Sequence, residues 1–139
     1  MASFLSAVSH APAGSRFELV LESTGRVVVP DLEIAVDSAT RKKGLLGRDG
    51  LPEGAGLVIA PTNAVHTFFM RFPIDIVFVS RPGAIVKVRA AVPAWRMAGA
   101  LKGYAVIELA AGGAARAGLQ RGDRVAVRPR ESMDHGSFV

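Results

Sequence analysis

Two carboxylates stand inside runs of aliphatic residues, where a charge is costly. Asp75 lies within the sequence PIDIVF, and Glu108 lies between Ile107 and Leu109. A carboxylate in such a setting is hydrogen-bonded, paired with a cation or placed at the edge of a site. Two carboxylates in different surroundings can serve as general acid and base, and a carboxylate can orient an imidazole such as His66 for proton transfer. The alternative, which the sequence favours, is that each carboxylate binds backbone N–H groups or an arginine.

The residues suited to hold a ligand are basic or aromatic. Arg71 and Arg48 have the charge to contact an anionic or carbohydrate-like group. Trp95, the only tryptophan, stands in a stretch bounded by proline and glycine, where its ring can stack on a ligand. For His66 the alternative is a packed ring with no role in binding. The predicted ligand-binding set is Arg71, Asp75, His66, Trp95 and Arg48.

Several kinds of chemistry are missing from the sequence. The chain has no cysteine, which excludes a disulfide scaffold, a zinc finger and a thiol nucleophile. No G-x-S-x-G turn is present, and the three histidines are scattered without metal-ligand spacing. No glycine-rich loop precedes a helix together with a lysine. We therefore predict no metal and no cofactor, assign no catalytic residue, and favour a protein that is not an enzyme.

The elements that must position these residues are mostly short strands. Alternating or continuous apolar runs bounded by Gly, Pro and Asn predict strands at 16–22, 27–29, 32–36, 57–60, 65–70, 74–80, 85–92, 104–109 and 124–127. A short helix is expected from Asp37 to Lys43, with Asp37 or Ser38 as its N-cap and Gly44 and Gly47 as stop signals, and another at 114–117. Eight or nine close strands with few helices predict a small antiparallel β-sandwich or a partly open β-barrel.

The segment 65–80 is the most apolar part of this pattern. Alternation along the expected strand 65–70 places His66, Phe68 and Met70 on one face. Pro73 cannot donate a ladder hydrogen bond, so it predicts a bend or bulge before the next strand. The ligand-binding set is expected around this bend.

The chain of 139 residues predicts one β-rich domain at 16–130, between a flexible leader at 1–15 and a flexible tail at 131–139. The leader lacks the basic start and continuous apolar core of a signal peptide. With the absence of cysteine, this favours a cytoplasmic location, with export as the alternative. No apolar run is long enough for a membrane-spanning helix.

The net charge of +5 is concentrated in the middle of the chain. Residues 54–107 contain six basic residues and one acid, Asp75, whereas the rest of the chain is balanced. Such a segment can attract a phosphate, a carboxylate ligand or nucleic acid. The alternative is a solvated basic face of the sheet.

A wider motif resembles a known family. The motif consists of Arg41-x-x-Gly44-Leu45-Leu46-x-Arg48, Leu51-Pro52, Gly56-Leu57, Phe68-Phe69-Met70-Arg71-x-Pro73-Ile74-Asp75-Ile76-x-Phe78, Gly83-x-Ile85, Ile107-Glu108-Leu109, Gly118 and Gly122-Asp123-Arg124-Val125. From about residue 32 to 127 it resembles the bacterial and archaeal domain of unknown function 192 family. The resemblance implies a small β-rich sandwich or barrel, and it carries over no activity and no catalytic residue. The family has Lys-Asn where this chain has Arg71-Phe72.

Three functions remain for the structure to discriminate. The first is a non-enzymatic binding module for an anionic or carbohydrate-like small molecule or a protein partner. The second is a hydrolase or lyase that uses Asp75 with Glu108 or His66, which requires the two groups to lie within about 10 Å in a concave pocket. The third is nucleic-acid binding, which requires the basic residues of 54–107 to line one continuous face.

Overall fold

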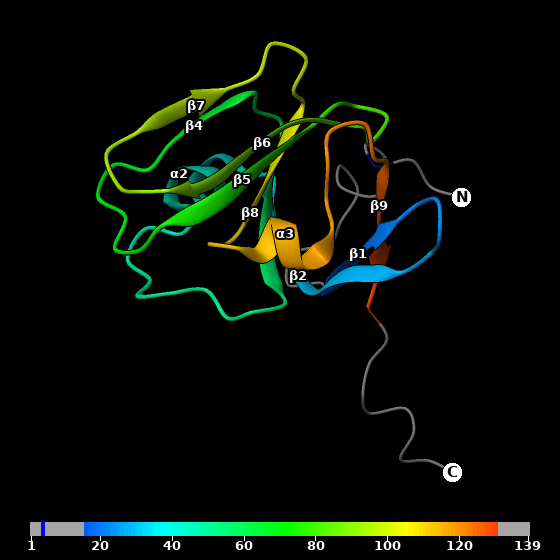
Figure 1. Ribbon diagram of the computed structural model, residues 1–139. Coiled ribbons are helices and arrows are strands. Elements are labelled where there is room, and N and C mark those ends of the chain that lie inside the picture. Colours follow the sequence, from blue (N-terminus) through cyan, green and yellow to red (C-terminus); the bar gives the residue numbers. More distant parts are fainter. Residues whose placement is uncertain (1–3, 5–15, 131–139) are drawn as a thin grey trace.

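Nine strands and two short helices make up the protein in a computed structural model that describes Phe4 and residues 16–130 (Figure 1). The strands are β1 (Phe17–Leu21), β2 (Val27–Ala35), β3 (Ala55–Ile59), β4 (Ala64–His66), β5 (Ile74–Val79), β6 (Ile85–Val92), β7 (Met97–Gly99), β8 (Ala105–Ala110) and β9 (Val125–Pro129). The helices are α2 (Ser38–Lys43) and α3 (Gly113–Ala117). The predicted β-rich fold class is confirmed.

Seven strands form one curled sheet in the order β6-β5-β8-β3-β2-β1-β9, and β4 pairs with β7 in a small second sheet. The two edges of the large sheet approach each other where Ala84 bridges to Arg124. There the Val125 N–H donates to the Gly83 carbonyl at 2.8 Å. The result is a half-barrel, in agreement with the partly open barrel expected from the sequence.

One strand pair departs from the antiparallel prediction, because β2 and β3 run parallel. A parallel pair needs a crossover connection, and the segment from Val36 to Gly54 supplies one that contains α2. Asp37 caps this helix by accepting the Thr40 N–H at 2.8 Å, and Gly44 ends it at a φ of 46°, as the sequence predicted.

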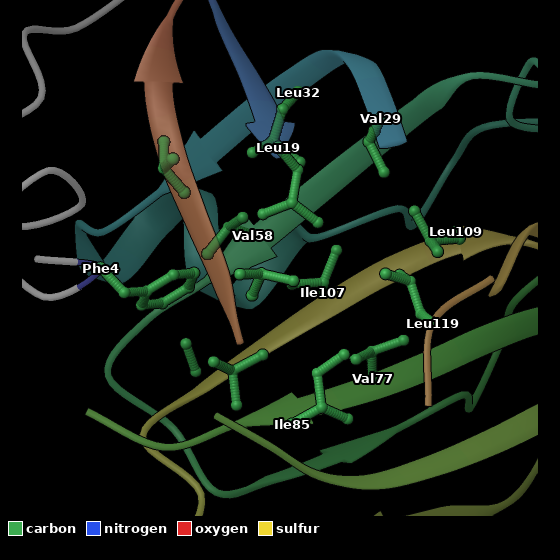
Figure 2. Close-up of a cluster of buried hydrophobic side chains, with 14 of the residues drawn as sticks. Phe4, Leu19, Val29, Leu32, Val58, Val77, Ile85, Ile107, Leu109 and Leu119 are labelled. Atoms are coloured by element: carbon green, nitrogen blue, oxygen red, sulfur yellow. The ribbon is translucent and has the colours of Figure 1, made fainter. Parts of the chain in front are cut away.

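Alternation along the strands divides the core into two clusters. One face of the sheet packs Leu19, Leu32 and Val77 with residues of α3 and with Phe4, part of which is shown in Figure 2. The other face packs Leu57, Ile76 and Phe78 against Leu45 and Ala98, which come from beyond α2 and from β7. Strand β5 is buried along its whole length. Apart from the buried Phe4, the predicted leader and tail lie outside the described residues.

The segment 65–80 is not two strands meeting at a proline. Strand β4 ends at His66, and the chain turns at Thr67–Met70, where the Met70 N–H donates to the Thr67 carbonyl at 3.1 Å. The prediction of a strand over 65–70 is therefore wrong beyond His66. The prediction that His66, Phe68 and Met70 lie on one face of that strand is wrong for the same reason. The expected 27–29 and 32–36 are one strand, and β7 was not foreseen.

Candidate functional site

Asp75 is a structural carboxylate. Its side chain is only 1% exposed. Oδ1 accepts the N–H groups of Ala91 at 2.8 Å and Gly112 at 3.1 Å, and Oδ2 accepts the Ala114 N–H at 2.9 Å. These bonds tie the end of β6 and the first turn of α3 to β5. Since its oxygens are occupied by the backbone, Asp75 has the structural role that the sequence favoured.

The two carboxylates lie on opposite faces of the sheet. Asp75 stands opposite Leu109 in the β5–β8 ladder, and Ile76 stands opposite Glu108. Residues paired across a ladder share a face, and neighbours along a strand point to opposite faces. The acid–base pair of Asp75 with Glu108 is therefore ruled out, because the sheet itself separates the two groups.

Glu108 is buried without the bonds that stabilise Asp75. It is 5% exposed, and none of the described residues donates a hydrogen bond to its carboxylate at hydrogen-bonding distance. Burial raises the pKa of Glu108 from 4.5 to about 7, against an opposing effect of the Arg48 charge. The carboxylate is thus ready to bond to something that the protein does not supply.

Glu108 lines a cleft of about 340 Å³ between α2, the stretch after it and strand β4. The mouth of the cleft carries the exposed Lys42, Lys43 and His66, whereas Glu108 reaches it from the buried centre of the sheet. A Cβ on Gly44 would lie 3.8 Å from Glu108 Oε1, so this glycine leaves the carboxylate uncovered. The cleft therefore has an acidic inner end and a basic entrance.

Arg41, which also lines the cleft, has a buried polar atom of its own without a partner. Its Nη1 donates to the Pro61 carbonyl at 3.2 Å, but its Nε is buried without a partner. Arg48 lies close by and holds Glu33 in a bidentate pair at 2.9 and 3.2 Å. Glu33 and Glu108 both stand opposite Leu57, on β2 and β8 respectively, so Arg48 acts on Glu108 as a nearby charge.

Four rings continue outward from the cleft and form an aromatic ledge, consisting of His66, Phe68, Phe69 and Trp95. The His66 and Phe68 rings stack with centroids 4.7 Å apart, and Phe68 stacks on Trp95 at 5.7 Å. Phe69 meets Trp95 edge to face at 4.6 Å. His66 lines the cleft as well, so the structure brings two residues of the predicted set, His66 and Trp95, into one surface.

The ledge is held by a buried threonine. Thr67 Oγ1 donates to the Pro93 carbonyl at 2.6 Å and accepts the Arg96 N–H at 3.0 Å. The Trp95 N–H donates to the Thr67 carbonyl at 3.1 Å. Phe69 and Trp95 both adopt a left-handed backbone, with φ of 65° and 67°. Such residues cost about 1 kcal/mol or more each and persist only where the surroundings hold them.

The remaining predicted residues are dispersed. Arg71 pairs with the exposed Asp49 at 2.7 Å. Among the other central basic residues, Lys87 Nζ donates inward to the Gly99 carbonyl at 2.7 Å and Arg81 lies over the Tyr104 ring at 5.2 Å. Lys87 is thus turned inward and Arg71 is paired with an acid, so these two residues do not contribute to the continuous basic face that the nucleic-acid hypothesis requires.

Sequence reasoning missed the wall of the cleft that α2 provides. The basic run 41–43 was understood only as favourable charge at a helix end. A crossover helix between parallel strands lies against the sheet, and this would have placed the run over β3 and β8. Within 16–130, no three potential metal ligands gather, and no helix there is long and apolar enough to cross a membrane.

Comparisons with known proteins agree with the fold. A family model described as DUF192, Uncharacterized ACR, matches residues 19–127. A crystal structure from Sinorhizobium meliloti 1021, of a protein named provisionally as a transcription regulator, is 24% identical with a TM-score of 0.70, and the match covers 81% of this chain and 92% of that one. A protein of unknown function from Novosphingobium aromaticivorans DSM 12444 is 25% identical with a TM-score of 0.68, covering 86% and 95%. No curated protein matches.

Proposed function

The chain belongs to the DUF192 family, and we propose that it is a small-molecule binding module whose ligand enters the cleft between α2 and β4. The observation that carries the proposal is Glu108, a buried carboxylate with no hydrogen-bond donor among the described residues, at the inner end of this cleft. A buried polar group is normally satisfied, and an exception calls for an explanation. The Glu108 oxygens are not enclosed by the fold but open into the cleft, and a ligand that donates a hydrogen bond there in place of water is the explanation that we propose.

The contrast with Asp75 supports this interpretation. Both carboxylates are buried in adjacent strands, yet the fold aims three backbone N–H groups at Asp75 and none at Glu108. Where the fold needs a carboxylate for its own stability, it provides donors. Glu108 contributes nothing comparable to the fold, and burial raises its pKa, so its placement destabilises the charged form. Such a cost is characteristic of functional sites.

The cleft also limits the kind of ligand. A volume of about 340 Å³ lies at the lower end of the range for small-molecule sites. The inner end offers a hydrogen-bond acceptor in Glu108. A ligand hydroxyl group can donate to this carboxylate. Lys42, Lys43 and His66 at the mouth favour an anionic group at the outer end. An anionic, hydroxylated or carbohydrate-like molecule fits this arrangement.

A second candidate function uses the same cleft. Glu108 and His66 both line it, and a carboxyl group with a pKa of about 7 suits proton transfer at neutral pH. In a hydrolase or lyase, Glu108 would act as acid or base at the inner end of the cleft, and His66 at the mouth would be the second group. The two candidates differ in the fate of the ligand, which returns unchanged from a binding module and is converted by an enzyme.

Calorimetry and thermal shift with sugar acids, sugar phosphates, amino acids and inorganic phosphate test the proposal. We expect at least one class to stabilise the wild-type protein, and Glu108→Gln and Lys42→Gln to weaken its binding tenfold or more. Glu22→Gln and Arg121→Gln make the same chemical changes on exposed residues outside the cleft and are expected to bind as the wild type does. Recovery of the ligand by mass spectrometry separates binding from turnover. If no class binds, or if Glu108→Gln binds as tightly as the wild type, the proposal fails.

A further inference from the structure

Large apolar side chains project from the outer surface around β4 and β7, at positions where soluble proteins place polar residues. Phe69 is 71% exposed, Trp95 57%, Met97 71% and Leu101 99%. Phe69 is a central residue of the turn closed by Thr67 and Met70, and Leu101 is a central residue of the turn in which the Gly103 N–H donates to the Ala100 carbonyl at 2.9 Å. Turn tips are ordinarily occupied by Gly, Pro, Asn, Asp or Ser.

These four residues, which we call the apolar rim, share one side of the molecule. Met97 is the exposed residue of β7, whereas Ala98 is buried against the large sheet, and Trp95 and Leu101 lie in the connections at the two ends of β7. Met97 stands opposite His66 of the aromatic ledge, and Phe69 contacts Trp95. Figure 1 places β4 and β7, with the connections at their ends, on the side of the molecule away from β1 and β9.

Basic residues accompany the apolar rim. Arg96 follows Trp95 and Lys102 follows Leu101, and Arg71 stands two residues after Phe69. All three are exposed, although Arg71 also pairs with the exposed Asp49. The single acid of the segment 54–107 is Asp75, which is buried on the backbone. The side that carries the rim therefore combines protruding apolar groups with positive charge.

The ring contacts indicate which kind of partner this surface suits. Phe68 is stacked against both His66 and Trp95, and Trp95 also meets Phe69. The Phe68 ring is stacked on both sides within the ledge, and the exposed Met97 and Leu101 have no ring face, so much of the surface offers aliphatic groups to a partner. Bases and sugars bind by stacking on open ring faces. An apolar medium that accepts protruding side chains without presenting a specific binding face, and that carries negative charge beside them, fits this surface better than a base or a sugar does.

We infer that the apolar rim with Arg96 and Lys102 is a membrane-docking surface that inserts into the interface of a lipid bilayer containing anionic lipids. Trp and Phe are favoured at the boundary between headgroups and acyl chains, and nearby Lys and Arg contact anionic headgroups. A second copy of this chain is a poorer occupant, because it would bring the same positive surface against itself. The Thr67 hydrogen bonds hold Phe69 and Trp95 outward in advance, so little ordering is required when they insert.

The single tryptophan of the chain lies on this surface and reports on insertion. The full-length protein is mixed with vesicles of phosphatidylcholine alone, or of phosphatidylcholine and phosphatidylglycerol in equal parts, and pelleted. We expect pelleting with the mixed vesicles, less with the neutral ones, and weakening by added salt. Trp95 emission should shift to shorter wavelength and be quenched by lipids brominated on their acyl chains.

Variants separate insertion from simple charge attraction. Met97→Ala with Leu101→Ala should lower partitioning into both kinds of vesicle at least tenfold, and Val27→Ala, an exposed apolar residue on β2, should not. Arg96→Gln and Lys102→Gln should each cost about fivefold on mixed vesicles only. Arg121→Gln, with the same charge change, should cost less. Circular dichroism checks that each variant is folded.

Several outcomes overturn the inference. They are no pelleting with either vesicle, pelleting that Met97→Ala with Leu101→Ala leaves unchanged, and Trp95 emission that acyl-chain bromines do not quench. Retention by a single-stranded oligonucleotide that Trp95→Ala abolishes would assign the surface to nucleic acid instead. A dimer in sedimentation equilibrium that the rim variants dissociate would assign it to self-association.

Discussion

Replacing Glu108 by glutamine should change how the stability of the protein depends on pH. The substitution keeps the shape of the side chain and removes its ability to ionise. In the wild type, burial raises the pKa of Glu108 to about 7, whereas the unfolded chain has the ordinary value of 4.5. Below pH 4.5 the carboxyl is protonated in both states and folds without penalty. As the pH rises through this interval the unfolded chain loses the proton first, so the wild type becomes less stable until the folded pKa is passed.

The size of this loss follows from the two pKa values. A rise from 4.5 to about 7 corresponds to about 3 kcal/mol, because each pKa unit is worth about 1.4 kcal/mol. We therefore expect the stability of Glu108→Gln, relative to wild type, to increase by roughly 2 to 3 kcal/mol between pH 5 and pH 8. In thermal unfolding this is a relative gain of roughly 5 to 12 °C in Tm.

Urea unfolding of both proteins at a series of pH values measures the difference directly. The charged groups around the cleft are present in both proteins, so the difference between them isolates the carboxyl group of Glu108; these groups are Glu33, Arg41, Lys42, Lys43, Arg48 and His66. Glu22→Gln is the control for an exposed carboxylate and should show no such trend. If the stability difference between Glu108→Gln and wild type does not change with pH, or falls as the pH rises, the conclusion that burial without a hydrogen-bond donor destabilises the charged form of Glu108 is wrong.

Two further substitutions test the supports of the site. Asp75→Asn should destabilise the protein by about 3 kcal/mol. The substitution replaces one carboxylate oxygen, which accepts hydrogen bonds from backbone N–H groups, by an NH₂ group that can only donate. Urea unfolding measures the loss, with Asp49→Asn as the control at an exposed position. A loss no larger than that of Asp49→Asn would contradict the structural role. Thr67→Val should cost about 1 to 2 kcal/mol of stability and broaden Trp95 emission, because the hydrogen bonds of Oγ1 to Pro93 and Arg96 are lost. Thr67→Ser keeps the hydroxyl group, so its stability and its emission should stay near those of the wild type. Equal behaviour of the Val and Ser variants would mean that the hydroxyl does not hold the ledge.

Local patterns were sufficient for most of the fold. The strand β6 was predicted at its observed bounds, and α2 is capped by Asp37 and Gly44, which were among the start and stop signals that predicted it. Both depend on interactions within a few residues, which a sequence displays directly. The parallel pairing of β2 with β3 was missed because it depends on where the crossover packs, which is a tertiary choice.

The aromatic ledge shows a different limit. Alternation over 65–70 predicted a strand, but Thr67 is buried and bonded to residues near position 95, almost thirty residues away. Those long-range bonds hold Phe69 in a left-handed backbone that its local preference disfavours. A prediction from alternation uses only neighbouring residues, so it cannot detect long-range hydrogen bonds that outweigh the local preference. The aromatic and basic residues of this stretch were nevertheless evident from its composition.

The location of the candidate site depends on one register. The sequence placed two carboxylates in apolar strands, and either one was a candidate for a site. Had the β5–β8 pairing slipped by one residue, Glu108 would lie opposite Asp75, and the two would face the same side of the sheet. In the observed register they are divided, and each face has one acid with its own environment. On one face α3 and β6 supply donors to Asp75, and on the other the basic helix α2 lies over Glu108 without supplying any. Among the described residues, Glu108 is the buried carboxylate to which no N–H group is aimed, and the site that we propose is therefore beside it and not at the bend before β5.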